Sequence, residues 1–122
     1  MARRRVSAAT GAATAALLLP LAAPTAAAAP LVTRFRASFQ STVVAVTWRV
    51  RAPARVTSFQ LYRAKAAQGA RRARVGPRLR GGRRTYRYLD ASAPLRAILH
   101  YWLVAVLPSG MRVTYGPVAV VT

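Results

Sequence analysis

The chain contains no cysteine, no glutamate, one aspartate and one histidine in 122 residues. Because no disulfide is possible, packing alone must stabilise a domain that works in an oxidising compartment. Zinc sites need several His or Cys ligands, and hard cations need several oxygen ligands. We therefore expect no metal and no cofactor. The pair Gly81-Gly82 is isolated and does not form a phosphate-binding motif.

Catalytic groups are equally scarce. General acid–base catalysis commonly uses two groups of contrasting protonation. The residue types of a Ser-His-Asp catalytic triad are present in Asp90, His100 and several serines, but no serine lies in a nucleophile-elbow motif. His100 also alternates with the core positions of an expected strand. We expect a protein that is not an enzyme, in which Asp90 closes a turn or pairs with a neighbouring arginine and His100 is half exposed.

Residues 1–29 have the three parts of a secretory signal peptide: a basic start of three arginines from Arg3, an apolar stretch, and an alanine-rich exit before Pro30. The predicted cleavage follows an Ala-x-Ala site at residues 26–28. This cut leaves Ala29-Pro30 at the new N-terminus, and the mature form is then a secreted, extracellular protein with one small domain, residues 30–122, and a modest core.

The alternative to cleavage is that this segment is retained as a membrane anchor. An uninterrupted span needs roughly 20 strongly apolar residues. Here Pro20 and Pro24 interrupt a stretch that is mostly alanine. We favour cleavage, after which we expect no stable membrane span.

Positive charge is the most unusual feature of the composition. Loss of the signal peptide leaves 17 basic side chains against the single Asp90, a net charge near +16. Such a field attracts polyanions, and the attraction falls steeply with salt. Arginine outnumbers lysine 19 to 1, which a GC-rich coding sequence would also produce. Codon bias does not account for the near-absence of Asp and Glu.

From residue 33 onward, apolar side chains recur at every second position in short runs rich in Val, Thr, Tyr and Trp. This periodicity is typical of β-strands. For example, Val44, Val46, Trp48 and Val50 fall on one face of the second run. The expected strands are 33–39, 44–50, 58–63, 75–79, 86–90, 99–106 and 112–121.

The periodicity dissolves between residues 64 and 85, where Ala, Arg and Gly dominate. We expect an arginine-rich loop there, with a short edge strand at 75–79 interrupted by Gly76-Pro77. Guanidinium groups suit phosphate, sulfate or carboxylate, so this loop is a candidate polyanion site. The alternative is a solvated, mobile loop without a dedicated ligand. The candidate residues are Arg71, Arg72, Arg74, Arg78, Arg80, Arg83 and Arg84.

Five segments, VTWRV (46–50), FQLYR (59–63), YRYLD (86–90), YWLVAV (101–106) and YGPVAV (115–120), stand in an order and spacing that resemble fibronectin type III-like domains of secreted bacterial proteins. The resemblance implies an all-β, seven-stranded Greek-key β-sandwich of immunoglobulin-like type. It further implies that Trp48 lies in the core and that the domain is a spacer or a binding module.

One position departs from the pattern of such domains. They usually place a tyrosine at the start of the sixth strand, where its hydroxyl binds the preceding loop, and this chain has Leu99 there. We expect that hydrogen bond to be lost and the loop at 91–97 to be looser.

A second candidate surface is the outward face of the third and sixth strands. If the alternation holds, Tyr62, Trp102 and Val104 share this face. An exposed Tyr-Trp patch bordered by arginines has the composition of a binding hot spot. The alternative is that arginine side chains cover these rings by stacking on them.

Two functions follow from these surfaces. The leading interpretation is a secreted, non-enzymatic binding or structural module that recognises an extracellular protein or polymer. The alternative is a cationic effector that binds an anionic cell-wall polymer, nucleic acid or membrane through its arginine-rich loop. Nucleic acid is the less favoured of these partners.

Overall fold

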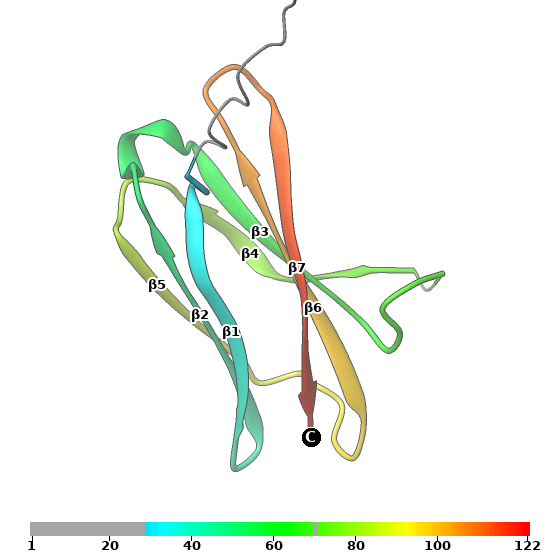
Figure 1. The fold of residues 1–122 in the computed structure, drawn as a ribbon. Coiled ribbons are helices and arrows are strands. Elements are labelled where there is room, and N and C mark those ends of the chain that lie inside the picture. Colours follow the sequence, from blue (N-terminus) through cyan, green and yellow to red (C-terminus); the bar gives the residue numbers. More distant parts are fainter. Residues whose placement is uncertain (1–28, 70) are drawn as a thin grey trace, which may run out of the picture.

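The computed structural model describes residues 29–69 and 71–122 (Figure 1). Apart from Ala29, the predicted signal peptide and its cleavage site lie outside the described residues. The described part folds into two antiparallel sheets that face each other, sheet A with strand order β1-β2-β5 and sheet B with strand order β4-β3-β6-β7. The strands are β1 (Val32–Gln40), β2 (Val43–Val50), β3 (Ser58–Ala64), β4 (Ala73–Arg80), β5 (Thr85–Asp90), β6 (Ile98–Val106) and β7 (Arg112–Val121).

A short 3-10 helix (Pro53–Arg55) connects β2 to β3. None of the helices in the described part of the chain has the length and hydrophobicity of a membrane span. The expected all-β class and the seven strands in two layers are confirmed. All seven expected strands match the structure to within two residues at each end, the accuracy with which strand ends are defined, and six of them match to within one residue.

The core forms between the two sheets from the side chains that the period-two pattern places inward. Trp48 on β2 is 1% exposed and stacks on Tyr86 of β5, with ring centroids 5.2 Å apart. Phe59 of β3 meets both rings edge-on, at 5.6 Å from Trp48 and 4.9 Å from Tyr86. The predicted core position of Trp48 is therefore confirmed, and three aromatic rings join the two sheets.

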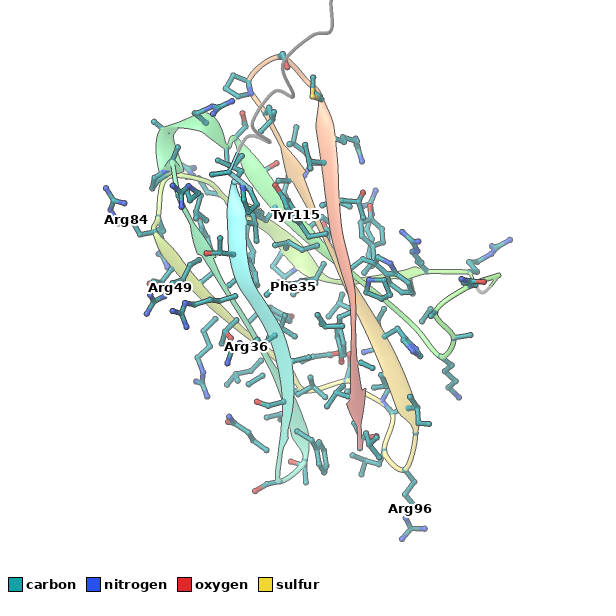
Figure 2. All side chains as sticks on the ribbon, in the orientation of Figure 1. Phe35, Arg36, Arg49, Arg84, Arg96 and Tyr115 are labelled. Atoms are coloured by element: carbon teal, nitrogen blue, oxygen red, sulfur yellow. The ribbon has the colours of Figure 1, made fainter. Side chains whose placement is uncertain are left out.

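On the other side of the sandwich, β1 of sheet A lies beside β7 of sheet B (Figure 1). Phe35 of β1 and Tyr115 of β7 pack against the core from this side, and Figure 2 shows both between the two strands. These two side chains thus cover the core at the edge of the sandwich that β1 and β7 form.

The expected edge strand within the arginine-rich stretch is confirmed, and it is longer than predicted, with non-strand segments before and after it. β4 is an edge strand that pairs with β3 over a longer range than the expected 75–79. Gly76 has a φ of 69°, which places a bulge there instead of a break. The buried amide of Gln60 donates hydrogen bonds to the carbonyls of Val75 and Gly76, at 3.3 and 3.2 Å, and satisfies backbone groups that the bulge displaces.

The loop between β5 and β6 is fixed at both ends, contrary to expectation. Leu99 is fully buried in the core, but Tyr101, two residues later, donates a hydrogen bond of 2.7 Å to Asp90 at the start of the loop. At the other end, the backbone N–H of Ala97 donates to the hydroxyl of Thr122 at 3.1 Å, and this hydroxyl donates to the carbonyl of Pro94 at 2.7 Å. The loop therefore keeps a tyrosine anchor, supplied by a different residue.

Candidate anion-binding surfaces

The single carboxylate side chain of the sequence, that of Asp90, is buried between the sheets. Asp90 accepts hydrogen bonds from the Tyr101 hydroxyl and from the backbone and hydroxyl of Ser92, and it forms an ion pair with Arg63. Burial alone would raise the pKa of the Asp90 carboxyl. The three hydrogen-bonding partners and the positive charge of Arg63 outweigh that effect and hold this pKa below its ordinary value. Asp90 is thus an ionised group that joins sheet A to sheet B.

His100 does not meet Asp90. Successive side chains of a strand point to opposite faces, so His100 lies on the outer face of sheet B while Tyr101 points inward to Asp90. The structure therefore does not bring Asp90 and His100 together as a catalytic triad would require. The expected turn-closing and arginine-pairing role of Asp90 is confirmed by its bonds to Ser92 and Arg63.

The seven candidate arginines of the polyanion site are all exposed, but they do not form one cluster. β4 has eight residues, and an extended strand of that length spans about 26 Å. Arg71 and Arg72 precede β4, Arg74, Arg78 and Arg80 lie on it, and Arg83 and Arg84 follow it. The stretch thus distributes its charge along an edge of sheet B and carries the last two arginines toward sheet A.

The predicted exposed patch on sheet B is wrong. Trp102 is 2% exposed and Val104 is 8% exposed, and Tyr62 is half-buried. The guanidinium carbon of Arg72 lies 4.0 Å from the centroid of a Trp102 ring, which is the distance of a cation–π contact. Because β6 lies between β3 and β7, side chains on both sides enclose its outer face. The alternative, in which an arginine covers the ring, describes the structure.

A third surface, on the outer face of sheet A, brings arginines from all three strands of the sheet together around an open groove of about 610 Å³. We refer to the arginines and threonines of this groove as the arginine face. Figure 2 shows Arg49 and Arg84 projecting from this side of sheet A, away from sheet B. The arginine face comprises Arg34, Arg36, Thr47, Arg49, Arg83, Thr85 and Arg87.

Strand register arranges the arginine face as an alternating pattern. In one row Thr47 of β2 lies between Arg36 of β1 and Arg87 of β5. In the next row Arg49 of β2 takes the central position, with Thr85 beside it on β5. On β2, the threonine therefore has arginine neighbours in its row, and the arginine has a threonine neighbour in its row.

A bulge in β1 contributes two arginines to the groove. The register advances by three residues on β1, from Thr33 to Arg36, against two on β2. Arg34 takes up the extra residue with a φ of 53°. Both Arg34 and Arg36 are exposed and line the groove.

The turn between β4 and β5 is held by the hydroxyl of Tyr86. This hydroxyl donates to the carbonyl of Arg80 at 2.7 Å and accepts from the backbone N–H of Arg83 at 3.2 Å. Gly81 fits so closely against the residues that precede β3 that a Cβ there would lie 1.9 Å from the carbonyl oxygen of Val56. The buried tyrosine thus fixes the position of Arg83 at the end of the arginine face.

The charges of the arginine face are not neutralised within the described part of the chain. Across residues 29–69 and 71–122, the one ion pair is that of Arg63 with Asp90. Arg87 donates a hydrogen bond of 3.1 Å to the neutral side chain of Gln40. Like charges on one face repel each other, and a bound anion would remove that repulsion.

Of known protein families, curated sequences and solved structures, only solved structures are similar to this chain. No protein-family model matches the chain, and no curated protein sequence matches it significantly. Among solved structures, an Fn3-like protein from Clostridium thermocellum is similar with a TM-score of 0.55 and 17% identity, over 70% of this chain and 84% of that one.

Two pectate lyases are also similar in structure. The enzyme from Erwinia chrysanthemi, solved in complex with tetragalacturonic acid, gives a TM-score of 0.60 at 22% identity over 74% of this chain. One from Pectobacterium carotovorum gives 0.60 at 16% identity over 70%. The matches cover 28% and 25% of those enzymes, so this chain corresponds to about a quarter of their length. The likeness to the Fn3-like protein shows that the fold of this chain is a fibronectin type III-like β-sandwich.

Proposed function

We propose that the domain is a secreted, non-enzymatic module that binds an anionic polymer outside the cell. The observation that carries this proposal is the arginine face, where five exposed arginines gather around one groove without an acidic partner in the described residues. Guanidinium groups bind carboxylate and phosphate oxygens through two parallel hydrogen bonds.

The structural neighbours support a binding role on polymers. The fold is that of an Fn3-like protein, and two of the neighbours are enzymes named for pectate, one of them solved with tetragalacturonic acid. Tetragalacturonic acid is an acidic sugar oligomer, so anionic polysaccharide is a chemically reasonable partner for a domain with this charge.

Protein recognition through Tyr62, Trp102 and Val104 has less support. A hot spot contributes to binding by burying a large exposed side chain against the partner. Trp102 is already covered by Arg72, so a protein partner would first have to displace that side chain.

A salt titration tests the proposal. The purified protein is mixed with polygalacturonate and, as a neutral control, with dextran, and the dissociation constant is measured by isothermal titration calorimetry. We expect binding to polygalacturonate that weakens by at least about tenfold between roughly 50 and 200 mM salt, since each contact with an anionic group releases a counterion. Equal affinity for dextran, or no binding to either polymer at low salt, would refute it.

A further inference from the structure

The arginine face has a defined spacing as well as a high charge. Strands in a sheet lie about 4.8 Å apart, so Arg36 on β1 and Arg87 on β5 are separated at the backbone by about 10 Å. Arg49 lies on the strand between them, two residues along, which is about 6.7 Å. These three cations form a triangle across sheet A, and Arg34 and Arg83 extend it at either side of the groove.

We propose that the arginine face is a binding site for a linear carboxylated polysaccharide, which lies across β1, β2 and β5 with successive carboxylates on Arg36, Arg49 and Arg87. This inference rests on the proposed function and adds the carboxylated class of the polymer, its path across the three strands and the arginine that binds each carboxylate. The hydroxyls of Thr47 and Thr85 lie between the arginines and are both donors and acceptors, which suits the hydroxyls of sugar rings.

The aromatic residues of the groove favour a polysaccharide over single-stranded nucleic acid. Proteins that bind single strands without sequence preference stack bases on exposed aromatic rings. The two aromatic residues that line this groove, Trp48 and Tyr86, are 1% and 8% exposed and are stacked on each other in the core. The groove thus offers charge and hydroxyls to its ligand, and its rings are not available for stacking.

The arginines along β4 are a weaker candidate for the same ligand. Arg72, just before β4, is engaged with Trp102, Arg71 also precedes the strand, and Arg74, Arg78 and Arg80 are spread along an edge strand of about 26 Å. They therefore provide general attraction, while the arginine face provides several cations within the reach of one short oligomer. This difference makes the β4 arginines a matched control.

The test compares two triple variants that lose the same charge. The face variant is Arg36→Ser, Arg49→Ser and Arg87→Ser, and the control variant replaces three exposed arginines outside the groove, Arg71→Ser, Arg74→Ser and Arg78→Ser. Binding of a defined oligogalacturonate is measured by calorimetry at about 100 mM salt, where exposed charges more than about 10 Å apart are screened. Thermal unfolding of both variants provides the folding control.

We expect the face variant to lose about 100-fold or more in affinity, because each hydrogen bond to a charged group contributes roughly a tenfold effect. The control variant should lose less than about fivefold, as expected of screened surface charge. Equal losses in the two variants would overturn the site assignment and leave the proposed function standing. Absence of binding by the unaltered protein would instead refute the proposed function.

Two further measurements test the ligand class and the chemistry. Replacing the same three arginines by lysine keeps the charge but removes the planar fork, and we expect about a tenfold loss of affinity for the oligogalacturonate. An unchanged affinity would overturn recognition of carboxylates by guanidinium forks. Tighter binding of single-stranded or duplex DNA than of the oligogalacturonate, with the same loss in the face variant, would overturn the polysaccharide assignment.

Discussion

Replacing Asp90 by asparagine should destabilise the domain far more than any other change of a single charge. The substitution keeps the shape of the side chain and removes its charge. It leaves Arg63, which is 18% exposed, without its anion, and it deprives the Tyr101 hydroxyl of a charged acceptor. Removing one partner of a buried ion pair typically costs about 3–5 kcal/mol.

The expected loss for Asp90→Asn lies at the lower end of that range, about 3 kcal/mol, because Arg63 retains some contact with water. In a domain of this size such a loss lowers the melting temperature by roughly 15 °C. Tyr101→Phe removes only the hydroxyl and should cost about 1–2 kcal/mol. Burial and then the Asp90 carboxylate raise the pKa of Tyr101, so this hydroxyl is a protonated donor at all ordinary pH values.

The same group controls the acid stability of the protein, because Asp90 is the only acidic side chain. Its pKa is lower in the folded protein than the ordinary value of 3.8. The stabilisation is therefore complete above about pH 4 and is lost as pH falls through the lower, folded pKa. One proton is taken up, so the stability changes by no more than about 1.4 kcal/mol per pH unit in this window.

Urea unfolding at a series of pH values between about 5 and 2 measures both effects. We expect the free energy of unfolding to fall in this window for the unaltered protein, and to be nearly independent of pH in Asp90→Asn. The C-terminal carboxyl titrates in both proteins and cancels in the comparison. If the variant lost stability in acid as steeply as the unaltered protein, Asp90 would not be the group responsible.

Three other changes test separate contacts. Gly81→Ala should destabilise the domain by about 3 kcal/mol in urea unfolding, because its Cβ would collide with the backbone of Val56, whereas a change below about 0.5 kcal/mol would contradict this contact. Arg72→Ala should expose Trp102 and shift tryptophan fluorescence to longer wavelength with a stability loss near 1 kcal/mol, and an unshifted spectrum would show that other side chains cover the ring. Tyr86→Phe should cost about 1–2 kcal/mol in thermal unfolding by releasing the turn between β4 and β5, and an unchanged melting temperature would count against that role.

Most of the sandwich is predictable because its strands have a local signature. Strands with one buried and one exposed face alternate in sequence, as Val44, Val46 and Trp48 do on β2, and this pattern needs no knowledge of neighbours. β4 lacks that signature because it is an edge strand with Val75 as its one fully buried side chain. Its Ala, Arg and Gly composition resembles a loop, so the sequence predicts a strand only at residues 75–79, and the pairing with β3 that extends the strand to Ala73–Arg80 is a non-local property.

The exposed patch on sheet B was mispredicted for a related reason. Alternation correctly places Trp102 and Val104 on the outer face of β6, but it does not tell what covers that face. The covering residue Arg72 precedes β4, about 30 residues earlier in the chain, in a segment expected to be a loop. Burial of an outward side chain depends on long neighbours that sequence periodicity does not locate.

The arginine face has a weak signal in the sequence, since Arg36, Arg49 and Arg87 each alternate along their own strand with residues that point into the core. What the sequence does not supply is the register that brings them together, which depends on a bulge in β1 and on β5 pairing beside β2. The arginine face is therefore assembled by non-local strand pairing. The run of arginines between 71 and 84 is denser in the sequence, but its side chains are more widely spread in the structure.

Register also bears on whether the arginines reflect codon bias alone. Like charges directly opposite each other on neighbouring strands are destabilising. Enrichment without selection would place some arginines in such pairs, yet in the central rows of sheet A the cross-strand neighbour of Arg36, Arg49 and Arg87 is Thr47 or another threonine. This arrangement lowers the repulsion within the free domain and keeps the cations at a spacing of several ångströms. A surface that concentrates positive charge while avoiding direct contact between its cations is suited to a polymer whose own charges are regularly spaced.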